Sequence, residues 1–446
     1  MPFRLRQIWQ QLRESLWFVP LLMVLASLGL AFGLIQLDQA SSASGTRRLP
    51  LLFGIDAAGA GGMLTAIAGS MLTVAALTFS LLLAAIAQVS NQYSPRALRN
   101  FMRDLVNQFV MGYFVSVFTY CLVVQGTIRD SPAGHFVPTT AVLAGLLLAL
   151  GGVGALLFFM HHVAESLQTG TLVRQIVTET ENQIGELFPH RFGQELQATA
   201  RPAAAAFAAA PEGWFAVYAE APGYLQQIDA QGLLAWTTRH RTVLRLDVHI
   251  GDFVGTGQRL MSVRAGMERA ATPTADWPAD LLGYVSLGRH RNPEQDVAFG
   301  LQQLVDIALK ALSPAVNDTT TAIMAIDYLG ELMGRLAHRT FPDALRSDGQ
   351  HLRVLVRAYA FTDYVCLAFD LVRENARGNP AVLRRLLRAL ALAASQVQAP
   401  HRQAALREQV ELVMAIAQGS LPTDYERAEV RTLYEELRPA WEQERG

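Results

Sequence analysis

Residues 62–89 read GMLTAIAGSMLTVAALTFSLLLAAIAQV and contain no Asp, Glu, Lys or Arg. A helix needs about 20 apolar residues to cross the hydrocarbon core of a bilayer. Because a backbone in lipid must satisfy its own hydrogen bonds, the stretch is expected to be a membrane-spanning helix rather than an open strand.

Three further apolar runs without Asp, Glu, Lys or Arg lie at about 17–37, 107–126 and 138–160. Together they predict a transmembrane domain over residues 1–162 in contact with the lipid bilayer. The first run is too long for the apolar core of a secretory signal, which favours an uncleaved anchor. The chain has 446 residues and a formal charge of −1, so nothing in its charge suggests nucleic acid as a partner.

Arginine placement predicts the orientation of the spans. Six arginines precede the first span or separate the second from the third, namely Arg4, Arg6, Arg13, Arg96, Arg99 and Arg103. The opposite loops hold only Arg47, Arg48 and Arg129. Positive residues favour the cytoplasmic side of a membrane. Both termini, and the whole chain after about residue 161, are therefore expected in the cytoplasm.

Three parts are expected after the membrane. Residues 163–211 predict a helical connector that ends in an alanine-rich segment. Residues 212–290 contain short alternating segments at 214–218, 223–228 and 243–250, which predict a small β-rich domain. Residues 291–446 show helical periodicity and predict an α-helical domain of five or six helices.

The segment from Gly251 to Leu260 resembles the hairpin of biotinyl/lipoyl-type barrel-sandwich domains, in which glycines form the turns. Those carrier domains attach their cofactor to a lysine at the hairpin tip. The segment contains no lysine, so the resemblance concerns architecture alone, and no cofactor is expected.

Two longer motifs point to one family. They are residues 79–104, with QYSPRALRNFMRD at 92–104, and residues 295–318, which read QDVAFGLQQLVDIALKALSPAVND. The chain resembles the predicted bacterial membrane proteins catalogued as domain of unknown function 2254. The resemblance implies an inner-membrane location and a four-span layout. It implies no activity and no catalytic residue.

Small and hydroxyl residues recur on one face of the second span. They are Thr65, Gly69, Thr73, Ala76, Ser80, Ala84, Ala87 and Asn91. Steps of three and four residues place them on one side of a helix. Such a stripe allows close packing of helices in lipid. Alternatively, it lines an ion pathway at the axis of a homo-oligomer.

Two further groups of polar residues stand out in the sequence. Arg96, Arg99 and Arg103 would share one helical face, where they either contact anionic headgroups or surround a vestibule that attracts anions. A second group consists of Arg291, Asp296, Asp306, Lys310, Asn317 and Asp318. Helix caps and ion pairs account for most of that group, and a ligand pocket is the alternative; Asn317 or Asp318 is expected to cap a helix.

No phosphate loop, dinucleotide fingerprint, zinc helix or nucleophile elbow is found in the sequence. We therefore expect neither an enzyme nor a metal site. Uncharged spans fit a passive conduit better than a pump, because proton relays use ionisable groups within the membrane. The leading hypothesis is a homo-oligomeric channel or channel-like conduit for ions, with cytosolic domains for assembly or gating. The alternative is a membrane-anchored sensor or scaffold whose cytosolic domain binds a ligand or partner protein.

Overall fold

The computed structural model describes residues 15–43, 57–92, 104–131, 134–166, 168–188, 194–197, 200–266, 276–341, 343–397 and 399–442. The chain forms two compact units, Met1–Leu172 and Val173–Gly446. Each unit is considered by itself.

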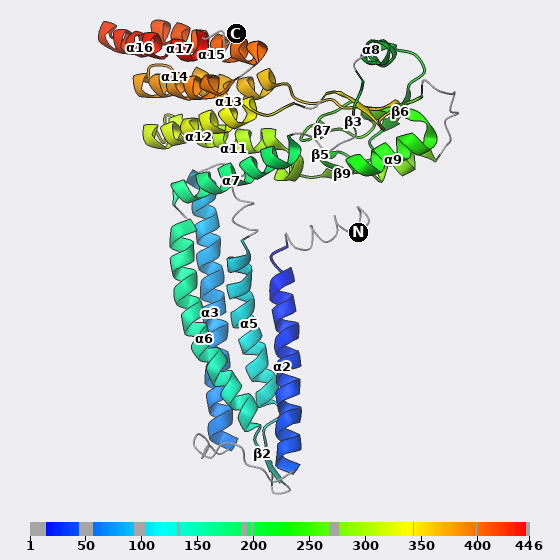
Figure 1. Ribbon diagram of the computed structural model, residues 1–446. Helices are drawn as coiled ribbons and strands as arrows, with labels where there is room; N and C mark the ends of the chain where they lie inside the picture. The colour runs from blue at the N-terminus through cyan, green and yellow to red at the C-terminus, as the bar shows by residue number, and fades with distance from the viewer. Residues whose placement is uncertain are drawn as a thin grey trace. The chain divides into compact units, whose positions relative to one another are not determined.

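Four long apolar helices form the first unit (Figure 1). They are α2 (Phe18–Ala43), α3 (Ala57–Gln92), α5 (Leu105–Gln125) and α6 (Thr139–Ser166). Each is long and apolar enough to cross a membrane, which confirms the four predicted spans. Two short antiparallel strands, β1 (Arg129–Ser131) and β2 (Gly134–Phe136), precede α6.

A glycine permits close packing between α2 and α5. A Cβ atom at Gly112 would lie 2.8 Å from the Cα atom of Pro20 and 2.8 Å from the sulfur of Met23. Real Cβ atoms do not approach so closely, so any larger residue would force the two helices apart. Close approach at small residues is the usual basis of helix packing in lipid, where burial of apolar area adds little.

A carboxylate contacts each end of α6, one from α2 and one from the N-cap residue of α5. At its start, Asp38 of α2 accepts the N–H groups of Thr140 and Ala141 at 3.3 and 3.0 Å. At its other end, His162 lies 2.5 Å from the carboxylate of Asp104. The first turn of a helix has unpaired N–H groups and a partial positive charge, so an anion there is stabilising.

We predict that Asp38→Ala destabilises the membrane unit. Asp38 is only 6% exposed, and losing a buried acceptor with a charge costs about 1.5–3 kcal/mol. The measurement is the thermal unfolding midpoint of the full chain in detergent. Glu165→Ala is the control, because this α6 carboxylate is exposed and its loss is expected to leave the midpoint unchanged. Equal unfolding midpoints for the two variants would contradict a stabilising contact between Asp38 and the first turn of α6.

Two sheets form the β-rich part of the second unit. A six-stranded sheet has the order β3-β10-β11-β6-β8-β4, and a three-stranded sheet has the order β7-β5-β9. The strands are β3 (Gln194–Glu195), β4 (Phe215–Tyr218), β5 (Gly223–Ile228), β6 (Thr242–Leu246), β7 (Phe253–Val254), β8 (Arg259–Ala265), β9 (Val285–Gly288), β10 (Leu345–Ser347) and β11 (Leu352–Leu355). The three predicted segments are thus strands β4, β5 and β6.

The strands in the described ranges do not close into a barrel, so the barrel-sandwich likeness is loose. The two strands of the expected hairpin, β7 and β8, also do not pair with each other. β7 pairs with β5, whereas β8 pairs with β4 and β6. The chain crosses from one sheet to the other at Gly257, whose φ is +75°. Val254 and Leu260 on either side of this turn are buried in the same core, which explains the crossing.

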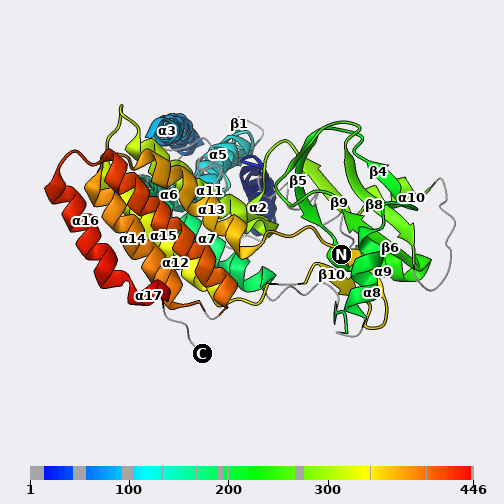
Figure 2. The same ribbon diagram turned by 90° about the horizontal axis from the view of Figure 1, so that it is seen from above.

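Helices complete the second unit. They are α7 (Thr169–Leu187), α8 (Arg201–Ala209), α9 (Ala230–His240), α10 (Trp277–Leu282), the short 3-10 helix η1 (Pro293–Gln295), α11 (Val297–Leu312), α12 (Thr319–Ala337), α13 (Phe361–Asn375), α14 (Pro380–Ser395), α15 (Pro400–Ser420), α16 (Asp424–Leu437) and α17 (Pro439–Glu442). In the C-terminal layer α12 packs on α11 and α14, and α14 packs on α15 and α16 (Figure 2).

Two strands lie where the sequence predicted only helices. β10 and β11 form an antiparallel pair, and β11 adds to the sheet in parallel beside β6. The four residues of β11 are all buried, including Arg353, whose guanidinium donates to Asp348 at 2.7 Å. A short strand with a buried, ion-paired arginine lacks the alternation that identifies a half-buried strand.

Candidate functional site

The small-residue stripe of α3 faces away from the rest of the membrane unit. The members from Thr65 to Ala87 are exposed. The buried residues of the same helix are Ala60, Leu64, Ala68, Met71, Thr78, Leu82 and Ala85. At about 100° per residue, the centres of the two faces lie on opposite sides of the helix. Apart from Thr65, whose hydroxyl bonds to Gln125 of α5, the stripe therefore points away from the other helices of its own chain.

The hydroxyl groups of the stripe donate within their own helix. Thr65, Thr73 and Ser80 donate to the carbonyl oxygens of Gly61, Gly69 and Ala76 at 2.8–2.9 Å. This back-bonding satisfies the donor in an apolar surrounding. A hydroxyl oxygen that donates once still has lone pairs, and that of Thr65 accepts the side chain of Gln125 at 2.7 Å. The stripe can thus face lipid, another helix or a hydrated ion.

Some predicted residues lie outside the described parts of the chain. Arg96, Arg99 and Arg103 do so, and Asn91 belongs to α3 without a described side chain. Their proposed roles stay predictions.

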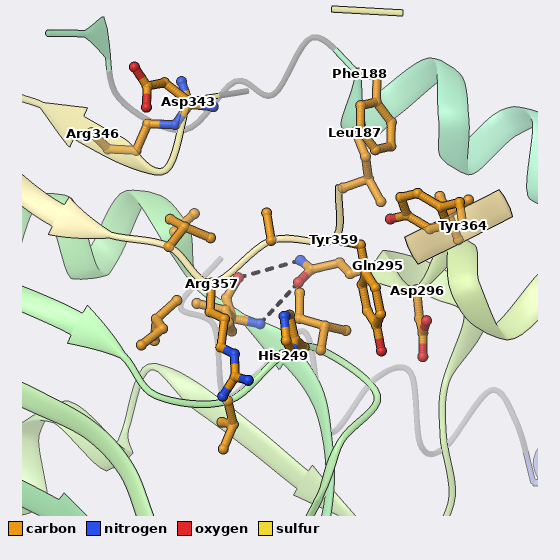
Figure 3. Close-up of a pocket in the computed structure, with 18 residues that line it drawn as sticks. Leu187, Phe188, His249, Gln295, Asp296, Asp343, Arg346, Arg357, Tyr359 and Tyr364 are labelled. Atoms are coloured by element: carbon orange, nitrogen blue, oxygen red, sulfur yellow. Dashed lines mark hydrogen bonds between the residues drawn. The ribbon is translucent and has the colours of Figure 1, made fainter. Parts of the chain in front are cut away.

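The second unit contains a cavity of about 140 Å³ between the ends of β5, β6 and β11 and the helices α7 and α13 (Figure 3). Most of its lining is apolar. The lining residues are Leu187, Phe188, Ile228, Ala230, Leu246, Val248, His249, Ile250, Gln295, Asp296, Val297, Asp343, Arg346, Val356, Arg357, Ala358, Tyr359 and Tyr364. Figure 3 shows Asp343 beside Arg346, apart from the group of Tyr359, Tyr364 and Asp296.

Asp296 is the most deeply buried carboxylate of this lining, with its side chain 2% exposed. It forms a bidentate pair with Arg291, with both N–O distances 2.8 Å. It also caps α11 by accepting the N–H of Phe299 at 2.9 Å. Burial raises the pKa of Asp296, against the lowering effect of the Arg291 guanidinium. The structure thus brings together two of the predicted pocket residues.

Gly251 makes this ion pair possible. Its φ is +90°, a conformation that residues with a Cβ rarely adopt. A Cβ atom there would lie 2.4 Å from a carboxylate oxygen of Asp296 and 2.7 Å from a nitrogen of Arg291. The turn after β6 therefore approaches the pair closely because this residue is glycine.

One wall of the cavity is aromatic. The ring of His249 stacks on Tyr359 at a centroid distance of 4.6 Å, and Tyr359 lies 5.4 Å from Tyr364. Phe188 lies 6.5 Å from Tyr364. His249 contacts Asp252 through Nδ1 at 3.2 Å, which fixes the orientation of its ring.

The other predicted pocket residues do not line this cavity. Asp306 accepts a hydrogen bond from Gln302 on α11, and Lys310 is exposed in the last turn of that helix. Asn317 has a φ of +47°. Asp318 caps α12 by accepting the N–H and the hydroxyl of Thr321 at 3.0 and 2.5 Å, so it is the capping residue of the two candidates.

We predict that Asp318→Ala loosens the first turn of α12. Loss of such a cap costs about 1 kcal/mol, so hydrogen exchange at the Thr321 amide is expected to become about fivefold faster. Asp318→Asn is the control and retains the cap. The hydrogen bonds from Thr321 lower the pKa of Asp318. Its stabilising effect is therefore present above the unfolded pKa of about 4 and is lost as pH falls through the folded pKa. Unchanged exchange in Asp318→Ala at neutral pH would contradict this role.

His249, Arg346, Arg357, Tyr359 and Tyr364 are cavity residues that the sequence analysis missed. They come from distant segments that the fold brings together, and none belongs to a motif. Within the described ranges, no group of three or more His, Cys, Asp or Glu side chains could hold a metal ion.

The four apolar helices and the mixed second unit define a multi-span membrane protein with a large non-membrane part. The chain belongs to the family described as "Predicted membrane protein (DUF2254)", which matches residues 13–392. It is 32% identical to "Uncharacterized protein MT1328" of Mycobacterium tuberculosis over 432 residues, which cover 96% of this chain and 81% of the relative. "Uncharacterized protein Mb1321c" of Mycobacterium bovis matches to the same extent. No solved structure matches the chain.

Proposed function

We propose that the protein is a homo-oligomeric, channel-like conduit for ions in the bacterial inner membrane, with α3 lining its axis. Both termini and the second unit lie in the cytoplasm in this proposal, where the second unit serves assembly or gating. The observation that carries the proposal is the outward direction of the α3 stripe. The proposal involves no cofactor and no catalytic activity.

The stripe supports association because it is a strip of small side chains on an otherwise bulky surface. Leu72, Leu77, Phe79, Leu81 and Leu83 of the same helix are exposed and suit contact with lipid. A Cβ atom at Gly69 would meet no atom within 4 Å. A helix of another copy could approach this backbone closely.

The oxygens on the stripe support conduction. Thr73 and Ser80 donate their hydrogens inside the helix, so the oxygen lone pairs of these two residues are directed outward. A ring of such oxygens around an axis could replace part of the hydration shell of a cation. The arginines at 96, 99 and 103 would instead favour anions. The charge of the permeant ion is therefore determined by the reversal-potential measurement described next.

We predict that Ser80→Leu lowers conductance without preventing assembly. Purified protein is reconstituted in planar bilayers, and its oligomeric state is measured by native mass spectrometry. A leucine at each copy narrows the axis and removes a ring of oxygens, so unitary conductance is expected to fall about twofold or more. The reversal potential in a salt gradient gives the sign of the ion.

The matched control is Ser70→Leu. Ser70 is exposed on the same helix and donates to the carbonyl of Ala66 in the same way, but lies ten residues from Ser80, about 80° around the helix. Its substitution is expected to leave conductance unchanged. Equal effects of the two substitutions would contradict the lining, and a silent monomer would exclude the conduit.

The cavity in the second unit favours a second candidate function. In that alternative the helices only anchor the chain, and the second unit is a sensor or scaffold that binds a ligand or partner protein. A small, mostly apolar cavity with a few converging polar groups is the common form of a ligand site.

A further inference from the structure

We infer that the cavity of the second unit binds a small carboxylate with an apolar, preferably aromatic, body. The inference deepens the sensor candidate and does not depend on the conduit. It follows from three features of the cavity: an unpaired hydroxyl that faces it, the balance of charge in the lining, and the shape of the walls.

The first feature is the hydroxyl of Tyr364. The residue is 7% exposed, and Figure 3 shows its hydroxyl directed toward the interior of the cavity. Among the described residues, neither this hydroxyl nor that of Tyr359 has a hydrogen-bond partner. Burial raises the pKa of both tyrosines, so both keep their proton and remain donors. A donor that faces a mostly apolar cavity and has no acceptor on the protein favours a ligand that supplies one.

The second feature is charge. The two carboxylates of the lining are each compensated by an arginine that does not line the cavity: Asp296 by Arg291, and Asp343 by Arg201 at 3.1 Å. The lining also contributes the guanidinium group of Arg357. Arg357 is exposed and donates to the backbone carbonyl of Asp247 at 3.1 Å, an interaction that leaves its charge uncompensated. An anion therefore complements this lining better than a cation does.

The third feature is the shape of the cavity. A water-sized sphere needs about 10–15 Å³, so the volume of about 140 Å³ suits a ligand of roughly ten non-hydrogen atoms. The rings of His249, Tyr359 and Tyr364 form one wall, and aliphatic side chains such as Ile228, Leu246 and Val356 form much of the rest. A planar ring can pack on aromatic side chains in this arrangement.

Gln295 and Asp296, the polar side chains next to the aromatic wall, already form hydrogen bonds to other groups. Its side-chain amide accepts the N–H of Ile228 at 3.0 Å and donates to the carbonyl of the same residue at 3.4 Å. Both ends of this amide are thus occupied at the end of β5, as the dashed lines in Figure 3 show. The carboxylate of Asp296 is similarly occupied by Arg291 and Phe299.

The test compares phenylacetate with phenylacetamide, a neutral molecule of nearly the same shape. Binding is measured by isothermal titration calorimetry on the full chain in lipid nanodiscs. Phenylacetate is expected to bind at least about tenfold more tightly than the amide, because a hydrogen bond to a charged group is stronger than one to a neutral group. Tyr364→Phe is expected to weaken phenylacetate binding by about tenfold or more while hardly changing amide binding.

Two further variants make the result specific. Arg357→Gln is expected to weaken binding severalfold and to reduce its dependence on salt, because the arginine is exposed to solvent. Tyr425→Phe is the matched control, since Tyr425 is an exposed tyrosine on α16 outside the cavity. It should bind phenylacetate as the unmodified chain does. Unchanged unfolding midpoints verify that each variant is folded.

Three outcomes would overturn the inference. They are equal affinity for the acid and the amide, equal loss in Tyr364→Phe and Tyr425→Phe, and no binding of phenylacetate up to about 10 mM, ten times a weak dissociation constant of about 1 mM. None of them bears on the conduit, which is judged by current and by the number of copies. Conversely, a silent protein that binds phenylacetate would refute the conduit and support the sensor.

Discussion

The need to satisfy every backbone polar group without water governs the membrane unit. Each of the four apolar helices does so along its length, but a helix end leaves N–H and C=O groups unpaired. At α6 the start is covered by the carboxylate of Asp38, and the last turns carry His162 in contact with Asp104. Asp104 also accepts the N–H of Val106 and so caps α5. Asp38, Asp104 and His162 of this unit thus all act near helix ends.

In the second unit, too, one buried carboxylate satisfies several groups at once. Asp296 begins α11, neutralises Arg291 and borders the cavity, while Gly251 permits the turn after β6 to lie against the pair. One carboxylate therefore joins the β-rich part to the helical part. Removing either charge would leave the other buried, and an uncompensated buried charge is far costlier than the pair. The cavity lies beside this junction, so its walls are held by both parts.

Much of this fold follows from local patterns in the sequence. The four spans are long and apolar, and the segments of β4, β5 and β6 alternate or are bounded by turns, so their assignment needed no tertiary information. The caps at Asp318 and Asp296 also have a local cause. β10 and β11 were missed because their stability comes from pairing with β6 and β3, partners more than 100 residues away in the sequence.

The candidate sites were less predictable for the same reason. Periodicity identifies the stripe on α3, but which way it faces depends on where α5 and α6 pack, and that is a property of the whole unit. The cavity combines residues near 187, 228, 249, 296 and 359, and no local rule connects these segments. Arg291 and Asp296 were identified because they are close in sequence. Tyr359 and Tyr364 had no such signal.

The two candidate functions differ in the number of chains that they require. Within one chain the stripe of α3 faces outward, so an ion pathway along it exists only when other copies surround the axis. The cavity is complete within residues 187–364 of a single chain. Ligand binding there is therefore possible at any oligomeric state, and a ligand could alter conduction only if it binds differently to two states of the assembly. Because Asp296 joins the two parts that form the cavity walls, a change in their separation is the structural difference through which such a preference would act.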